Sequence, residues 1–241
     1  MKKTILLSAT LLAGVSFAHA ATTVTASSFT GITADSDLDN SGNLVTAINY
    51  TNAGGTGPVI NGISFTNVSS TAGLYTRSNP VQITDNTANW SAATAPPLDA
   101  FDAIFDGRAN TATNQGGQTI GLSLSGLSTG TEYTIQLLSG DAALKHTTSF
   151  YSGSSSSSIG NADKAEKLIN QQALGATTSD LGGIFTATFT TDDGNAFFTF
   201  ERSGPDNQPV LSGYVLTAVP EPSSAALLGL GGLALILRRR K

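Results

Sequence analysis

Hydrophobic and polar residues alternate in short runs along most of the chain, and Gly, Asn, Asp and Ser separate the runs. In 119–127, for example, Ile120, Leu122 and Leu124 fall on one face and small or polar residues on the other. A period of two residues is typical of β-strands with one buried face. The runs with this pattern are 43–51, 59–68, 119–127, 131–140, 183–191, 195–202 and 209–219. Short strands separated by turns predict an all-β fold, an antiparallel β-sandwich or jelly roll.

Two stretches lack this alternation, 96–107 and 161–175, and they predict short helices that cross over the sandwich. Both place apolar side chains three or four residues apart, which is the spacing of one helix face. The second stretch also starts at Asn161, a favourable N-cap, and stops at Gly175, a favourable C-terminal residue. The residues with helical spacing are Leu98, Phe101, Ile104 and Phe105 in the first stretch and Ala165, Leu168, Ile169 and Gln172 in the second.

The first twenty residues have the pattern of a secretory signal peptide. Lys2 and Lys3 precede an apolar stretch at 5–18, and small residues surround the bond between Ala20 and Ala21. These features predict an N-terminal signal helix that is removed during export, so that the mature chain begins at Ala21. A retained membrane helix or a buried core helix is the alternative, and the basic start together with the cleavage pattern favours export.

A second apolar segment, 225–237, contains only Ala, Leu, Gly and Ile and is followed by Arg238, Arg239, Arg240 and Lys241. As a helix it would be about 20 Å long, which is short for a hydrocarbon core of about 30 Å. Long Arg side chains that reach the interface and local thinning of the bilayer compensate for the difference. We therefore expect a C-terminal transmembrane helix that stops at the arginines and keeps the C-terminus in the cytoplasm.

The residues Pro220, Glu221 and Pro222 stand directly before this segment. A Pro-Glu-Pro sequence, a short apolar helix and a terminal Arg cluster resemble the PEP-CTERM sorting signal of exosortase-bearing Gram-negative bacteria, also known as the ice-binding protein C-terminal domain. The resemblance implies that a membrane-embedded exosortase recognises Pro220, Glu221 and Pro222 and processes the chain nearby. Prolines favour an extended segment that such an enzyme can reach. The predicted domains are a signal peptide at 1–20, a β-sandwich at 21–217 and the sorting signal at 218–241.

The body itself carries a weaker resemblance. The stretch 124–141 reads as a strand, a Gly-rich turn and a second strand, and it resembles a hairpin of exported bacterial β-sandwich domains of the fibronectin-III-like and galactose-binding-like kinds. Together with 60–66 and 211–219, it is most similar to the galactose-binding-like jelly roll of PEP-CTERM cargo proteins. The resemblance implies a fold for the body, and the sorting signal implies nothing about the body's ligand.

Composition removes several function classes. The chain has no cysteine, which excludes disulfides, thiolate catalysis and thiolate metal sites. After loss of the signal peptide His146 is the only histidine, which excludes an ordinary zinc site, and the chain has no G-x-S-x-G nucleophile motif. The carboxylates allow many pairs for a glycan hydrolase, but the sequence selects none. We therefore expect a protein that is not an enzyme.

Net charge argues against nucleic acid as a partner. Six of the twelve basic residues lie in the two terminal segments, and sixteen of the seventeen acidic residues lie in the body. The body therefore has a net charge near −10, which repels nucleic acid and anionic lipid and favours cations or neutral partners.

One acidic stretch suggests calcium as a cofactor. Asp35, Asp37 and Asp39 have the alternate spacing of a calcium-binding loop. The stretch departs from the EF-hand pattern, because Asn40 replaces the glycine at the sixth position and Thr46 replaces the bidentate Glu at the twelfth. An acidic turn that leads into the strand at 43–51 is the favoured interpretation, and a calcium loop like those of lectins is the alternative.

An exposed aromatic ring would suit a polysaccharide ligand. Trp90, the only tryptophan, lies in a polar stretch, and Tyr75 lies upstream of it. Both are candidate glycan contacts, although a single tryptophan more often packs in a core. The threonines do not form the regular Thr-x-Thr array of an ice-binding face.

These observations favour an exported protein that is held briefly in the inner membrane, processed by exosortase and released to the cell surface or extracellular matrix. Non-catalytic binding of extracellular polysaccharide is the function we expect from the sequence. A purely structural or adhesive matrix protein without a ligand pocket is the second hypothesis, and a glycan hydrolase is the third.

Overall fold

The computed structural model describes residues 22–76, 80–85, 99–111, 119–140, 146–153, 164–174, 182–203 and 209–221. These residues form three β-sheets with almost no helix. The seven-stranded sheet contains, in spatial order, β1 (Thr23–Gly31), β12 (Gly182–Thr190), β9 (Tyr133–Gly140), β15 (Gly213–Ala218), β2 (Asn43–Tyr50), β4 (Ile63–Val68) and β3 (Gly55–Ile60). The neighbours pair antiparallel, except that β2 and β4 run parallel.

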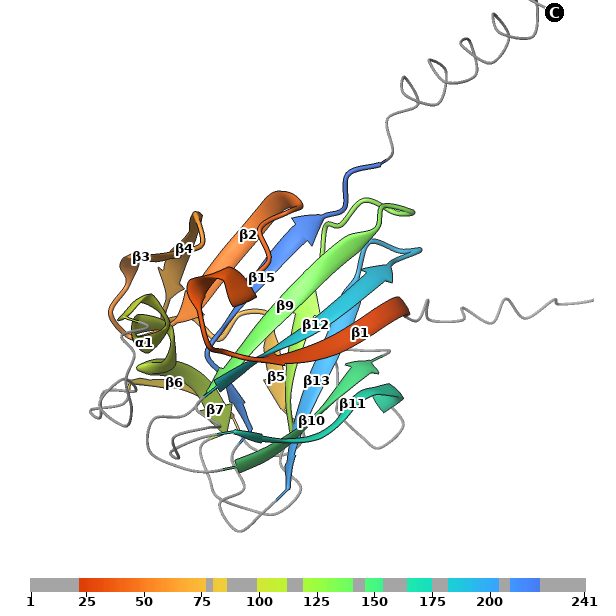
Figure 1. The fold of residues 1–241 in the computed structure, drawn as a ribbon. Coiled ribbons are helices and arrows are strands. Elements are labelled where there is room, and N and C mark those ends of the chain that lie inside the picture. The colour runs from red at the N-terminus through yellow and green to blue at the C-terminus, as the bar shows by residue number, and fades with distance from the viewer. Residues whose placement is uncertain are drawn as a thin grey trace, which may run out of the picture.

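Two smaller sheets and two short helices complete the described part of the chain (Figure 1). The five-stranded sheet has the order β11 (Lys164–Leu174), β10 (His146–Gly153), β13 (Ala196–Ser203), β8 (Thr119–Leu124) and β5 (Leu74–Thr76). The three-stranded sheet has the order β14 (Val210–Leu211), β7 (Gly107–Thr111) and β6 (Val81–Asp85). The helices are the 3-10 helix η1 (Asp35–Asp37) and α1 (Asp99–Phe105).

The two larger sheets pack against each other through phenylalanines. Phe185 and Phe189 of β12 meet Phe150 of β10 and Phe198 and Phe200 of β13, and all five side chains are at most 2% exposed. Ring centroids of facing pairs are 5.1–5.8 Å apart, within the range of favourable aromatic contacts. The alternation read from the sequence therefore does point the apolar face of each strand into a sandwich core.

The all-β fold and one of the two expected helices are confirmed. The stretch 96–107 contains α1, whose residues Phe101, Ile104 and Phe105 are fully buried. The expected signal helix and C-terminal helix lie outside the described residues. Among the residues that the structure does describe, no helix has the length and apolarity needed to cross a bilayer.

The helix expected at 161–175 is wrong, because Lys164–Leu174 forms β11 at the edge of the five-stranded sheet. Its ladder with β10 contains several register shifts, which place extra residues on β11. Such bulges break the two-residue period, so that the neighbours Leu168 and Ile169 both pack against the core. The spacing of the apolar residues in this stretch resembled one face of a helix. Hydrogen bonds to β10 stabilise the segment as a strand, whereas a short helix on its own is only marginally stable.

The run 59–68 is two strands rather than one. Asn61 and Gly62 join β3 to β4 with φ angles of 47° and 79°. Two consecutive residues in the left-handed region are what a tight hairpin turn requires, and Asn-Gly is the preferred pair. The turn makes β3 the edge strand of the large sheet, a position that shapes the pocket described below.

The stretch 124–141 does contain two strands and a Gly-rich turn, but the strands do not pair with each other. β8 belongs to the five-stranded sheet and β9 to the seven-stranded sheet, so the turn crosses from one layer to the other. Leu127 N donates to Gly194 O (3.0 Å) and Gly130 N to Thr191 O (3.1 Å), which binds this turn to the neighbouring turn between β12 and β13. The two turns close one end of the sandwich.

Two glycines allow α1 to dock on the large sheet. Gly140 of β9 and Gly182 of β12 are register partners, and the ring of Phe105 lies over both. A Cβ atom added at Gly140 would lie 2.5 Å from Phe105 Cδ1, and one added at Gly182 would lie 2.8 Å from Phe105 Cζ. Because real Cβ atoms do not approach so closely, the bare backbone at this point is a packing requirement.

We therefore expect Gly140→Ala to lower the free energy of unfolding by about 1–3 kcal/mol, since the added methyl group overpacks a rigid aromatic contact. Gly31→Ala is the matched control, because a Cβ there would meet no atom within 4 Å. Urea unfolding of purified residues 21–219 measures both. Equal unfolding midpoints for the two variants would contradict this view of the α1 contact.

Candidate functional site

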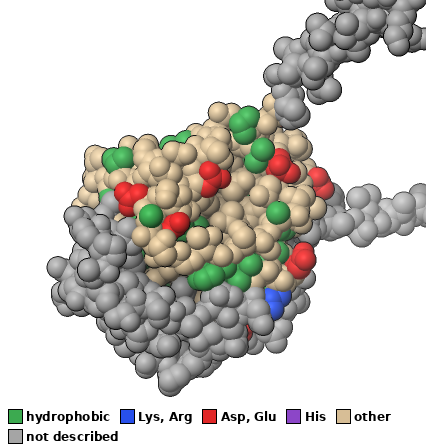
Figure 2. All heavy atoms as spheres, in the orientation of Figure 1, with side chains coloured by type: hydrophobic (Ala, Val, Ile, Leu, Met, Phe, Trp, Pro, Cys, Tyr) green, Lys and Arg blue, Asp and Glu red, His purple; other side chains and the backbone are tan. Residues whose placement is uncertain are grey.

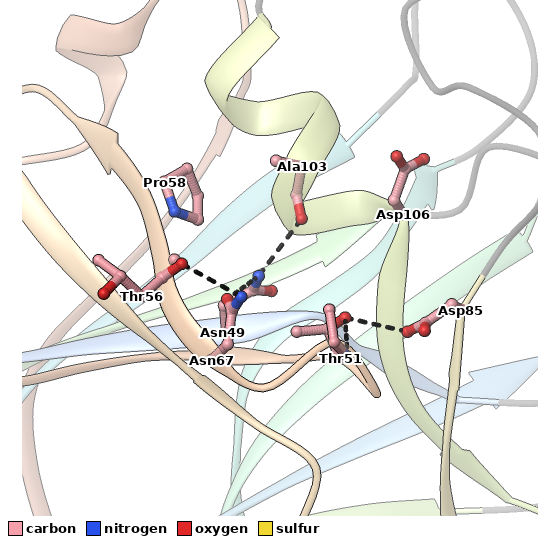
Figure 3. Close-up of a pocket in the computed structure, with 10 residues that line it drawn as sticks. Asn49, Thr51, Thr56, Pro58, Asn67, Asp85, Ala103 and Asp106 are labelled. Carbon is pink, nitrogen blue, oxygen red and sulfur yellow. Dashed lines mark hydrogen bonds between the residues drawn. The ribbon is translucent and has the colours of Figure 1, made fainter.

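A polar pocket of about 550 Å³ lies where the edge of the seven-stranded sheet meets α1 and β6. Asn49 of β2 and Asn67 of β4 lie at its centre, and Thr51 follows directly after β2 (Figure 3). Figure 3 also shows Thr56 and Pro58 of β3 on one side and Asp85 and Asp106 on the other. Four strands and a helix therefore contribute to one concave site.

Two asparagine side chains form the hydrogen-bonded centre of the pocket. Asn49 Nδ2 donates to Asn67 Oδ1 (2.8 Å) and to Ala103 O in α1 (3.3 Å). Asn67 Nδ2 in turn donates to the carbonyl oxygens of Gly54 and Thr56, each at 3.4 Å. Since every partner of the two Nδ2 atoms is an acceptor, these bonds fix the orientation of both amides.

The remaining polar atom of Asn49 is an acceptor without a donor. Asn49 is 1% exposed, and its Oδ1 is buried with no hydrogen-bond partner. An unpaired buried acceptor costs about 1–3 kcal/mol, so most folded proteins avoid it. Asn49 lines the pocket, so this unpaired oxygen lies in the wall of the site.

A glycine lets the asparagines come this close to β3. A Cβ atom added at Gly57 would lie 2.7 Å from Asn67 Oδ1 and 2.9 Å from the carbonyl oxygen of Phe65. Any larger residue at 57 would displace Asn67 and with it the bond to Asn49. The Asn-Gly turn at the other end of β3 holds this strand in register with β4.

Asp85 attaches β6 to the end of β2. Its Oδ1 accepts hydrogen bonds from Thr51 Oγ1 (3.1 Å) and from Asn52 N (2.9 Å), and Asn52 Nδ2 donates to Ile83 O (3.3 Å). These contacts order the wall of the pocket that belongs to the three-stranded sheet. They also keep a carboxylate beside the pocket, which disfavours anionic ligands.

Of the two predicted glycan contacts, the structure places one. Tyr75 lies on β5 with its ring over Gly121, and its hydroxyl is 3.4 Å from Thr199 Oγ1. It is half-buried on the five-stranded sheet and does not line the pocket. Trp90 lies outside the described residues. Both therefore stay predictions as glycan contacts.

The acidic stretch folds as a capped turn. Asp37 Oδ2 accepts hydrogen bonds from Thr33 N (2.6 Å), Ala34 N (2.8 Å) and Thr33 Oγ1 (2.9 Å). Asp39 accepts two from Ser41, at N (2.9 Å) and Oγ (3.0 Å). Asp35 begins the 3-10 helix η1.

Within the described ranges, no group of three or more His, Cys, Asp or Glu side chains is placed to hold a metal ion. Asp37 and Asp39 both use their carboxylates for local backbone donors, as an acidic turn requires. Calcium binding by this turn stays a prediction.

The sorting motif begins where the large sheet ends. Val219 N donates to Glu132 O (2.9 Å), one residue before Pro220. Pro220 and Glu221 are exposed, and a proline has no N–H with which to continue the ladder. Pro220 and Glu221 therefore lie outside the sheet and are open to solvent. The other residues predicted for export and anchoring, Ala20, Ala21, Pro222, Arg238, Arg239 and Arg240, lie outside the described residues.

Sequence reasoning missed the pocket. Asn49 and Asn67 occur within runs that were correctly read as strands, but nothing in those runs shows that the two strands are neighbours. The available signal was the residue type, because Asn is unfavourable in strand interiors and usually has a reason to be there. Asp85 and Thr51 carry no such signal.

Residues 218–241 match the family model of the PEP-CTERM protein-sorting motif. The matched segment includes Pro220, Glu221 and Pro222, the apolar run and the basic cluster. The match confirms the prediction that this segment carries a PEP-CTERM sorting signal, the kind of motif on which exosortase acts. No curated protein matches the sequence significantly.

The body is similar in fold to carbohydrate-binding β-sandwich modules and to part of a viral protein. The CBM22-1 xylan-binding domain from Paenibacillus barcinonensis is 12% identical over 76% of this chain and 99% of its own, with a TM-score of 0.45. CBM35 from the same organism is 10% identical over 60% of this chain and 98% of its own, with a TM-score of 0.31.

The enzymatically active domain of tailspike protein 4 from bacteriophage CBA120 is 8% identical over 63% of this chain and 20% of its own, with a TM-score of 0.38. These values describe a distant similarity of fold, and they carry no argument about ligand or activity.

The capped acidic turn gives a prediction that depends on pH. Partial burial alone would raise the pKa of Asp37, but the hydrogen bonds from Thr33 and Ala34 outweigh it and lower the pKa below the ordinary value of 3.8. A carboxyl with a lowered folded-state pKa stabilises the fold above its ordinary pKa, and this contribution is lost as pH falls through the folded-state value. We expect Asp37→Ala to lower the free energy of unfolding by about 1 kcal/mol at pH 7 and by much less well below pH 3.8.

Urea unfolding of the wild type and variant across this pH range measures the difference. Asp35→Ala is the matched control and should have little effect, because Asp35 supplies no such cap. If Asp37→Ala lowers the free energy of unfolding by the same amount at every pH, the capping role of the carboxylate is contradicted. If calcium stabilises the wild type and does not stabilise the Asp35→Ala variant, the result would instead favour a calcium-binding loop.

Proposed function

We propose that this protein is an exported, exosortase-sorted surface or matrix protein whose body binds neutral extracellular polysaccharide, without catalysis, in the pocket around Asn49. The observation that carries the proposal is the buried Oδ1 of Asn49, an acceptor without a donor in the wall of an open polar site. A sugar hydroxyl can donate to it and accept from a neighbouring group, which is how hydroxyl-rich ligands are held.

The rest of the lining supports a neutral ligand. Asn67, Thr51 and Thr56 offer uncharged donors and acceptors, and Pro58 adds an apolar surface on which the C–H face of a sugar ring can rest. Asp85 keeps a carboxylate beside the pocket, which disfavours anions, and the described residues that line the pocket include no Lys or Arg. A phosphate or a sulfated glycan is therefore a poorer match than a neutral one.

The sorting signal supports the location. The PEP-CTERM motif implies export and processing by exosortase, and the predicted signal peptide at 1–20 and apolar run at 225–237 provide the two membrane segments that this route needs. Before processing, the predicted C-terminal helix anchors the chain in the inner membrane with Arg238, Arg239 and Arg240 on the cytoplasmic side. Afterwards the body meets polysaccharide outside the cell.

A polysaccharide array followed by titration calorimetry with residues 21–219 tests the binding. We expect saturable binding to a neutral polysaccharide, with a Kd that rises about 10-fold or more in Asn49→Ala and in Asn67→Ala, since each variant removes hydrogen bonds worth about 1–2 kcal/mol. Thr129→Ala is the control, because Thr129 is exposed in the turn at the far end of the sandwich. Thermal unfolding shows whether each variant is folded.

The other hypotheses give different results in the same assay. Absence of binding to any glycan, with and without calcium, would contradict the proposal and favour a structural matrix protein. Binding that Trp90→Ala abolishes and the two asparagine variants leave unchanged would move the site away from the pocket. Release of sugar from the polysaccharide by the purified body would favour a hydrolase.

A further inference from the structure

The first strand of the body, β1, begins at the same end of the large sheet at which the last strand, β15, ends. The register pairs at this end are Thr23 with Thr190, Phe189 with Tyr133, Tyr133 with Ala218, and Ala218 with Asn43. They place the start of β1 and the end of β15 in the same row, on the same side of the molecule in Figure 1. We call this row, with the adjoining turns 125–132 and 191–195, the tether end.

The residues next to the first and last strands of the described body are both fixed to the tether end by hydrogen bonds. Thr22 Oγ1 accepts a bond from Phe197 N (3.1 Å), close to the turn at 191–195. Val219 N donates to Glu132 O (2.9 Å), immediately before β9. The two segments that the sequence predicts to cross the membrane therefore leave the body from one end rather than from opposite ends.

The pocket lies at the opposite end of the same strands. Asn43 starts β2 at the tether end, whereas Asn49 near its last residue pairs with Gly213, the first residue of β15. Asn43 and Asn49 are six residue steps apart along the strand, a length of about 20 Å. In Figure 1, β3, β4 and α1, which form the pocket with β2, accordingly lie on the side away from the start of β1 and the end of β15.

Chain length limits how far the tether end can be from the bilayer. From Ala218 to Ala225, where the apolar run starts, there are seven residue steps, which span at most about 24 Å when fully extended. Between Ala18, the last residue of the first apolar stretch, and Thr22 there are four steps, at most about 14 Å.

Adhesion to lipid does not decide the orientation. Asp192 and Asp193 are exposed in one turn of the tether end, and they repel anionic headgroups. Leu44 and Val45, near the start of β2, are about half exposed, which gives a small apolar surface at most. Figure 2 shows acidic and hydrophobic side chains next to each other beside the point where β15 ends. The short chain segments that join the body to the predicted membrane helices therefore set its orientation at the bilayer.

From this geometry we infer that the anchored protein stands on its tether end, with turns 125–132 and 191–195 toward the inner membrane and the pocket directed away from it. The inference rests on the export and anchoring part of the proposed function. It places Pro220 and Glu221 in the gap between body and bilayer, where a membrane-embedded enzyme can reach them. It also leaves the pocket open to ligand on the outer side of the inner membrane before the chain is cut.

The absence of cysteine allows a direct test on the full-length protein. Thr129→Cys marks the tether end, and Ser69→Cys, one residue after β4, marks the pocket end. Both positions are exposed, and each variant takes a single fluorescent donor. The labelled chains, whose tether is uncut because exosortase is absent, are reconstituted into vesicles of zwitterionic lipid that contain a lipid-linked acceptor.

We expect energy transfer from position 129 to exceed that from position 69 about twofold or more, because the strands separate the two positions by roughly 20 Å. Residues 21–219 with the same labels and no anchor should show little transfer from either position. Equal transfer from both positions of the anchored protein, or greater transfer from position 69, would overturn the orientation. Failure of the full-length chain to float with the vesicles would instead overturn the anchoring on which the orientation rests.

Discussion

The hydrogen bonds of β15 on both of its edges are the interaction on which the rest of the structure depends. β15 lies in the middle of the seven-stranded sheet, paired with β9 on one side and β2 on the other. Its first residue, Gly213, pairs with Asn49 of the pocket, and its last residue, Ala218, lies two positions before Pro220. A six-residue strand thus runs from the pocket to the residues just before Pro220. Pro220 ends the ladder, since it has no N–H to donate.

The pocket exists because three units that are separate in sequence pack around the end of β2. The Asn-Gly turn folds β3 back on β4, α1 docks through Phe105 on two glycines, and Asp85 binds β6 to the residues after β2. Two of these contacts use a residue that is small or polar within a strand, namely the glycines under Phe105 and Asp85 of β6. A buried polar atom without a partner is another local departure of this kind, and the Oδ1 atom of Asn49 is one.

The sequence predicted the part of the fold that depends on local pattern. Alternation in 183–191 correctly buried Phe185 and Phe189, and helical spacing in 96–107 correctly located α1. The pattern failed at β11, where bulges opposite β10 let Leu168 and Ile169 both reach the core and so imitated a helix. Bulges arise from pairing between distant segments, and no local period reveals them.

The same limit applies to the candidate site. The Asn-Gly turn at 61–62 was a readable signal that was overlooked, whereas the parallel pairing of β2 with β4, which brings Asn49 to Asn67, is a property of topology alone. The sorting signal needed no topology, because Pro220, Glu221 and Pro222 with the segment that follows are contiguous, and the match of 218–241 bears this out. A sorting signal whose residues are contiguous can be recognised from the sequence, but a site assembled from distant strands cannot.

The intact mass of the protein isolated from its native host tests the central claim, that a body complete at Val219 is exported and then cut in the exposed segment beyond it. We expect a mature chain that begins at Ala21 and ends within a few residues after Val219. The mass of the complete 241-residue chain, or a C-terminus inside Gly213–Ala218, would contradict the claim.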